Sequence, residues 1–157
     1  QALIKLGLVP FGEIIDTDET CPTLTYNTIS RHQSRLVRTR IASNRSAWLA
    51  GTQVGEVYTV PISHGEGRFL CSEEFVRKLA ANGQIATQYV DENGVPGMDV
   101  DVNPNGSIWA VEGITSPDGR VLGKMGHSER VADGLYKNVD GCYDMKLFQS
   151  AKAYFSL

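Results

Sequence analysis

Two His-x-Glu triplets are the residues of this chain whose types and spacing could carry chemistry. They are His64-Gly65-Glu66 and His127-Ser128-Glu129, and each follows an apolar stretch typical of a β-strand. In an extended backbone, residues two apart point to the same side, so each histidine is expected to meet its own glutamate. A carboxylate that accepts the imidazole N–H fixes the tautomer and leaves the other ring nitrogen to take a proton from a nucleophile. The triplets therefore predict an oriented base, for which the sequence shows no obvious nucleophile.

Each triplet taken alone is weak, because a surface histidine beside an acid is common. Two triplets at the ends of predicted strands, both flanked by glycines, favour a ligand site. A metal-dependent hydrolase is an alternative, since His64, Glu66, His127 and Glu129, with His32, would form a histidine and carboxylate ligand set. The leading interpretation needs no metal.

The chain has three cysteines, Cys21, Cys71 and Cys142, which are far apart in the sequence. Their odd number and the absence of a Cys-x-x-Cys pair indicate neither a disulfide framework nor a zinc ribbon. None lies in the Gly-rich turn between strand and helix that exposes a nucleophile. A reducing cytoplasm is the expected location.

Composition excludes several classes of protein. The chain has 157 residues, 41% of them hydrophobic, and a formal net charge of −3, which indicates one domain over residues 1–157 and no nucleic-acid partner. The basic segment Arg31 to Arg40 alternates with apolar residues, so a strand with one solvated face is favoured over anion binding. No apolar run reaches the roughly 18 residues of a membrane-spanning helix, so no membrane is expected.

Strand and helix signals alternate along the chain. Strands are expected over Leu36–Ala42, Val54–Ile62 and Ile85–Val90, a helical turn over Ser46–Leu49, and a hairpin from Ile108–Thr115 and Arg120–Met125. Ser72 is expected to cap a helix that runs to about Ala81, and Tyr143–Phe155 a terminal helix. Asn103–Ser107 is expected to be a constrained loop, either a simple turn or a polar clamp. Gln1–Gly7 resembles the end of a helix with a glycine cap, so we expect the chain to be part of a longer polypeptide.

Four motifs in order, SHGEGRF, NPNGS, GITSPDGRVLGKM and GHSER, resemble the C-terminal glutaminase domain of phosphoribosylformylglycinamidine synthase. That domain belongs to the class I glutamine amidotransferases, whose cysteine nucleophile lies in a Gly-x-Cys-x-Gly-x-Gln turn. Gln1 resembles the last residue of this turn. The resemblance covers nearly the whole chain.

The resemblance implies a Cys-His-Glu triad with His127 as general base and Glu129 as its orienting acid. The cysteine would lie a few positions before Gln1, and the three cysteines present do not match it. Ser63, His64, Gly65 and Glu66 would bind the substrate glutamine. Many relatives have proline between the histidine and the glutamate, where this chain has Ser128, but the spacing is kept.

The resemblance also implies an α/β fold, a partial flavodoxin-like three-layer sandwich that lacks its N-terminal βα units. Loss of those strands would expose sheet edges and favour dimerisation or strand exchange. The expected partner is the synthetase region of the same enzyme, which would use ATP and Mg²⁺ to amidate formylglycinamide ribonucleotide; this chain itself would bind no cofactor. The isolated chain is expected to be inactive, or to act as a noncatalytic docking module.

Overall fold

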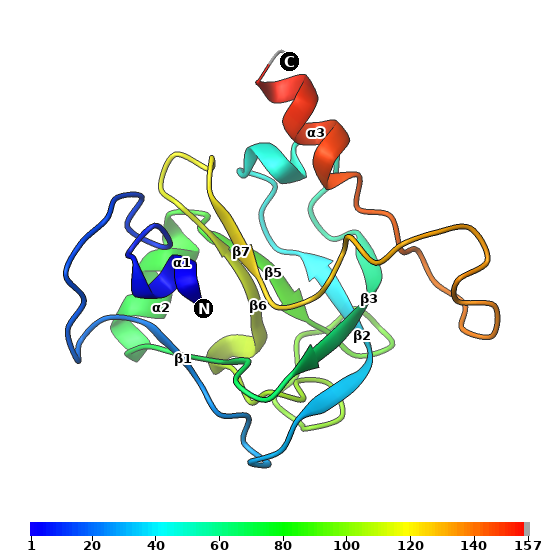
Figure 1. Cartoon of the computed structure of the whole chain (residues 1–157), viewed down its shortest axis with the longest axis horizontal. Coiled ribbons are helices and arrows are strands. Elements are labelled where there is room, and N and C mark those ends of the chain that lie inside the picture. Colours follow the sequence, from blue (N-terminus) through cyan, green and yellow to red (C-terminus); the bar gives the residue numbers. More distant parts are fainter. Residues whose placement is uncertain (156–157) are drawn as a thin grey trace.

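The computed structural model describes residues 1–155, and its main sheet has five strands. Figure 1 shows their arrangement. In spatial order these are β3 (Val57–His64), β2 (Gln33–Ile41), β5 (Ile85–Tyr89), β6 (Val111–Thr115) and β7 (Leu122–Lys124). Every pair of neighbours in this sheet is antiparallel. A second, small sheet pairs β1 (Thr23–Thr25) with β4 (Arg68–Leu70).

Short helices flank the main sheet. They are α1 (Ala2–Lys5), α2 (Glu73–Ala81), α3 (Leu147–Tyr154) and the 3-10 turns η1 (Ala47–Leu49) and η2 (Ile108–Ala110). The predicted cap of α2 is confirmed, because the Ser72 hydroxyl accepts the Phe75 N–H at 3.1 Å. Among the described residues, no helix has the length and apolarity needed to cross a bilayer.

Two apolar clusters pack against the sheet, and neighbouring residues of β5 enter different ones. Ile85 packs with side chains from α1, α2, β1 and β4, whereas Ala86 packs with side chains from η1, β2 and β3 and with Met145. Since successive residues of a strand point to opposite faces, both faces of the sheet are covered. The α/β class predicted from the sequence is confirmed.

The sheet curls so that the chain leaving β7 returns to β3, the strand at the other edge (Figure 1). The His127 N–H donates to the Pro61 carbonyl of β3 at 2.8 Å, and a Cβ placed on Gly126 would lie 2.7 Å from Val60 Cγ2. This curl brings the two triplets, which are far apart in the sequence, to neighbouring parts of the fold.

The predicted elements are largely confirmed, with shifted boundaries. The strand predicted over Val54–Ile62 runs Val57–His64, and two further differences have a clear cause. Ile108–Ala110 forms a 3-10 turn, not the start of a strand, because Trp109 and Ala110 have positive φ angles of 49° and 53°. The terminal helix begins at Leu147, not Tyr143. Before it, the Cys142 carbonyl accepts the Thr59 N–H at 2.7 Å, so this segment extends along the edge of β3.

The basic segment Arg31 to Arg40 lies mostly in β2, as the strand interpretation predicted. Arg35 and Arg38 donate to the backbone carbonyls of Asp101 and Glu92, and Arg40 donates to the Gln88 side chain. The Arg35 and Arg38 guanidinium groups hold the loop after β5 against the sheet.

Candidate active site

The second triplet forms the predicted histidine and carboxylate contact. His127 Nδ1 lies 2.8 Å from Glu129 Oε1, and the two side chains are 32% and 54% exposed. If Nδ1 carries the proton that Glu129 accepts, Nε2 is the nitrogen left to act as a base. The contact arises in a turn, closed by the Arg130 N–H donating to the His127 carbonyl at 3.0 Å, and not in the extended backbone that the sequence argument assumed.

Glu129 is held in its ionised form. Partial burial acts to raise its pKa, but hydrogen bonds from its own backbone N–H and from His127, with the charges of His127 and Arg130, bring the pKa below its usual value. An ionised carboxylate at this distance stabilises an imidazolium at His127. The pair can therefore accept a proton and later return it.

A cavity of about 290 Å³ lies beside this pair. Polar groups from Gln1, Glu112, Lys124, His127, Ser128 and Glu129 line it together with apolar side chains from α1, β1, β6 and β7. A mainly apolar pocket with a few convergent polar groups is the usual form of a small-molecule site. None of the three cysteines lines the cavity.

The first triplet does not form the predicted contact. Glu66 Oε2 accepts a hydrogen bond from Gln1 Nε2 at 2.7 Å, and the ring nitrogens of His64 have no hydrogen-bond partner within residues 1–155. The expectation fails because β3 ends at His64, so the chain turns at Gly65 and carries Glu66 away from the ring. None of Ser63, His64, Gly65 or Glu66 lines the cavity.

His64 is packed inward over a glycine. A Cβ on Gly67 would lie 2.1 Å from His64 Nε2 and 2.8 Å from Asn105 Nδ2, so only glycine fits beneath the ring. Burial lowers the pKa of His64, against the opposing effects of Asn105 and Glu112. This histidine is therefore held neutral.

The sequence of this chain matches a known protein family. Residues 1–155 match the model of the CobB/CobQ-like glutamine amidotransferase domain. The chain belongs to this family. Family membership confirms the resemblance to the glutamine amidotransferases that the four motifs indicated.

Two similar proteins are both named phosphoribosylformylglycinamidine synthase subunit PurQ. The protein from Synechocystis sp. is 43% identical over 144 residues, which cover 90% of this chain and 57% of the relative. The protein from Aquifex aeolicus is 36% identical over 141 residues, which cover 90% of this chain and 56% of the relative. This amidotransferase chain therefore spans somewhat more than half the length of these relatives.

A solved structure has the same fold. The structure of PurLQS from Thermotoga maritima matches 99% of this chain and 57% of its own chain, with a TM-score of 0.70 and 25% sequence identity. The likeness supports the class I glutamine amidotransferase fold that the motifs implied.

Asn27 holds the first triplet in place, a contact that no sequence pattern predicted. It is 1% exposed, and its Nδ2 donates to the carbonyls of His64 and Arg31 at 2.8 and 2.9 Å while its Oδ1 accepts the Gly67 N–H at 3.0 Å. Its backbone N–H also donates to the Gly65 carbonyl. Asn27 thus fixes the whole turn of the first triplet, and its place in a polar, irregular stretch gave no signal of this.

The Asn103–Ser107 loop supports the same turn from the other side. Asn103, Asn105 and Ser107 are almost completely buried. The Ser107 hydroxyl accepts the Phe69 N–H and donates to the Gly67 carbonyl, and Asn105 Nδ2 donates to the Tyr89 hydroxyl. The loop is a buried support next to the first triplet, and it does not line the cavity.

The four ligands of the metal alternative do not converge. Within residues 1–155, no three His, Cys, Asp or Glu side chains lie close enough to bind a metal ion. His32 Nε2 instead contacts the Ser63 hydroxyl at 3.2 Å. The arrangement gives the metal-dependent hydrolase no ligand set.

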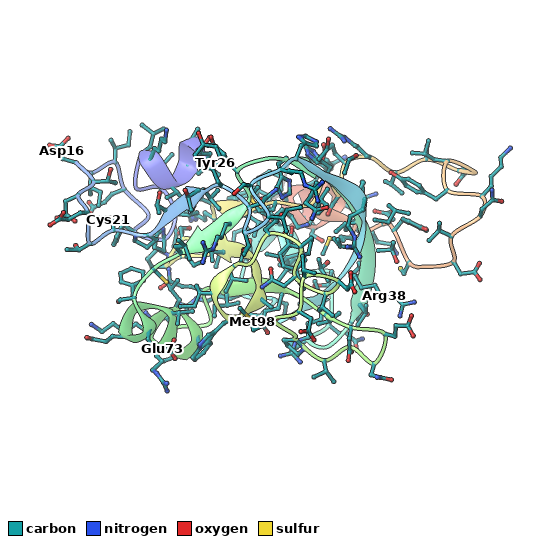
Figure 2. All side chains as sticks on the ribbon, turned by 90° about the horizontal axis from the view of Figure 1, so that it is seen from below. Asp16, Cys21, Tyr26, Arg38, Glu73 and Met98 are labelled. Atoms are coloured by element: carbon teal, nitrogen blue, oxygen red, sulfur yellow. The ribbon has the colours of Figure 1, made fainter. Side chains whose placement is uncertain are left out.

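None of the three cysteines is placed as a residue of the cavity wall. Cys21 lies in a loop that projects at one end of the molecule (Figure 2), and Cys142 is exposed beside β3. Cys71 is partly buried, and desolvation raises the pKa of its thiol to about 11, which leaves almost no thiolate at neutral pH. None of them is placed as the partner of His127.

Proposed function

We propose that this chain is the glutaminase portion of phosphoribosylformylglycinamidine synthase, an enzyme of purine biosynthesis. In this role it hydrolyses glutamine, and the ammonia serves the ATP-dependent amidation of formylglycinamide ribonucleotide. The observation that carries the proposal is the contact between His127 and Glu129 at the edge of the cavity. The names of the PurQ relatives support the same enzyme.

The proposed reaction uses a cysteine thiolate as nucleophile. His127 first takes the proton of the thiol. The thiolate attacks the side-chain amide carbon of glutamine, a C–S bond forms, and the C–N bond breaks as His127 gives that proton to the departing ammonia. Water then hydrolyses the thioester, with His127 taking its proton, and glutamate leaves. Glu129 stabilises the imidazolium in both steps.

We propose that the nucleophile comes from outside residues 1–157. Two observations support this: no cysteine of the chain lines the cavity, and the PurQ relatives are longer than the part matched here. Gln1 lines the cavity and donates to Glu66, so a cysteine shortly before Gln1 would stand close to both. Glutamine would then be bound next to Gln1 by the first triplet segment, which comprises Ser63, His64, Gly65 and Glu66.

The proposed enzyme also implies a partner and a location for this chain. The synthetase region of the enzyme would receive the ammonia in the cytoplasm and would bind ATP and Mg²⁺, leaving this chain without a cofactor. Neither nucleic acid nor a membrane is a proposed partner. Strand exchange or dimerisation would fall on β7, the edge of the sheet that borders the cavity.

Glutamate release from glutamine tests the proposal. The chain alone should release none, and joining it to a preceding segment with the Gly-x-Cys-x-Gly-x-Gln motif should restore release. Release by the chain alone would mean that Cys21, Cys71 or Cys142 is the nucleophile, and alanine variants of the three would identify it. A joined protein that binds a synthetase region but never turns over glutamine would make this chain a noncatalytic docking module.

A further inference from the structure

A buried ion pair lies beside the second triplet, in the wall of the same cavity. Glu112 of β6 is completely buried, and Lys124 at the end of β7 is 8% exposed; Lys124 Nζ lies 3.1 Å from Glu112 Oε1. Glu112 also accepts hydrogen bonds from the Thr87 hydroxyl and the Gly126 N–H. Its carboxylate therefore joins β5, β6 and the start of the triplet segment.

Lys124 completes the link on the other side of His127. Its ammonium group donates to the Ser128 hydroxyl at 3.0 Å and to the Gly126 carbonyl at 3.3 Å, in addition to Glu112. Ser128 is itself 8% exposed and donates to Met145 Sδ at 2.9 Å. All three N–H bonds of the ammonium group thus have acceptors.

Three consecutive residues are held by this arrangement. Glu112 and Lys124 bind Gly126, the Pro61 carbonyl binds the His127 N–H, and Lys124 binds the Ser128 hydroxyl. The His127 side chain takes no part in these contacts and lies at the cavity beside Glu129. Proline would fix the φ angle at position 128, whereas serine does not. The hydrogen bond from Lys124 to the Ser128 hydroxyl restricts the conformation of this residue instead.

The energetics of burial favour a positional role over a stabilising one. Desolvation of two charges commonly cancels their attraction, and a well-packed apolar pair of similar size is often at least as stable. A buried charged pair whose hydrogen bonds converge on the residues either side of a base therefore contributes geometry more than stability.

We propose that Glu112 and Lys124 are positioning residues that hold Gly126–Ser128 so that His127 meets Glu129 and faces the cavity. The inference rests on the proposed function, because it assigns the pair to the same base. Neither residue needs to touch glutamine to act in this way. Their effect reaches the reaction through the orientation of the imidazole.

Nitrogen-15 NMR of the histidine rings tests the inference on the chain itself, without any turnover. The chain has only three histidines, so single substitutions assign the signals. Wild type should show His127 as the Nδ1–H tautomer, and Glu112→Gln/Lys124→Met, which removes both charges, should show a mixture of tautomers. The matched control is the exposed pair of α2, Glu74→Gln/Lys78→Met, which should leave the His127 signal unchanged.

Two further readouts keep the inference falsifiable. If the double variant does not fold, Ser128→Ala is measured in its place. This variant keeps the ion pair and should cause a smaller shift toward a mixture of His127 tautomers. In the joined, active protein the double variant should lower kcat about a hundredfold with KM little changed, as expected for a misplaced base. A folded double variant with an unaltered His127 tautomer would overturn the inference, whereas an inactive wild type would overturn only the proposed function.

Discussion

The segments Ser63–Glu66 and Gly126–Glu129 carry the same His-x-Glu spacing, and their histidines have opposite surroundings. His127 is partly exposed beside a cavity and contacts its glutamate, whereas His64 is packed over Gly67 and has no contact with Glu66. The turn after each histidine makes the difference. Sequence spacing selects candidates for an oriented base, and the local backbone decides which candidate becomes one.

Removal of the acid from each triplet should give the largest difference between them. In the joined protein, Glu129→Gln should lower kcat by about a hundredfold or more, because the imidazole loses its tautomer and its counter-charge. Glu66→Gln should mainly raise KM, because Glu66 is proposed to bind glutamine and does not contact the imidazole of a base. Steady-state glutamate release measures both, and equal losses of kcat would contradict the assignment.

Crowding beneath His64 should have the next largest effect. Gly67→Ala should lower the free energy of unfolding by about 1–3 kcal/mol, because the added Cβ would overlap the imidazole. Gly65→Ala is the control, since a Cβ there meets nothing within 4 Å and should change stability by less than about 0.5 kcal/mol. Urea denaturation measures both variants, and a neutral Gly67→Ala would show that His64 can move aside.

Loss of the Asn27 side chain should loosen the first triplet alone. Asn27→Ala removes three hydrogen bonds and leaves the Gly67 N–H without its acceptor, at a cost of about 1–3 kcal/mol. Amide hydrogen exchange should increase at Gly65–Gly67 and stay constant at Gly126–Glu129. Asn138, an exposed asparagine in the segment before the terminal helix, gives the control variant Asn138→Ala. Faster exchange in both segments would mean that the two triplets are coupled.

The smallest expected effect is a pH dependence from His64. Burial lowers its pKa below the ordinary value of 6.5, so the unfolded chain binds a proton first as the pH falls. His64 therefore favours the folded state above about pH 6.5, and this contribution is lost as the pH falls toward the lowered pKa. His64→Gln should flatten the stability profile in that window, and an unchanged profile would show that His64 is not held neutral.

The sequence predicted the local elements well because their signals are local. The Ser72 cap, the apolar strands and the hairpin around Ser116–Gly119 depend on residues close in the chain. The contact between His127 and Glu129 was also predicted, although it forms in a turn. The resemblance located the family from four motifs.

The rest depends on contacts between distant residues, which no local pattern reports. The return of the chain to β3 after β7, the buried pair of Glu112 and Lys124, and the anchoring of residues 64–67 by Asn27 all join segments that the sequence separates. A charged residue in a strand predicts a solvated face, so Glu112 gave no sign of its burial. The separation of His64 from Glu66 was not foreseen, because the turn between them is anchored by Asn27, which is distant in the sequence.

Comparison of His127→Ala with His64→Ala in the joined, active protein tests whether His127 is the base. Loss of the base should lower kcat for glutamate release by about 10²–10⁴-fold in His127→Ala, whereas His64→Ala should keep kcat within about tenfold of wild type. A larger loss of kcat in His64→Ala than in His127→Ala would contradict the assignment of His127 as the base.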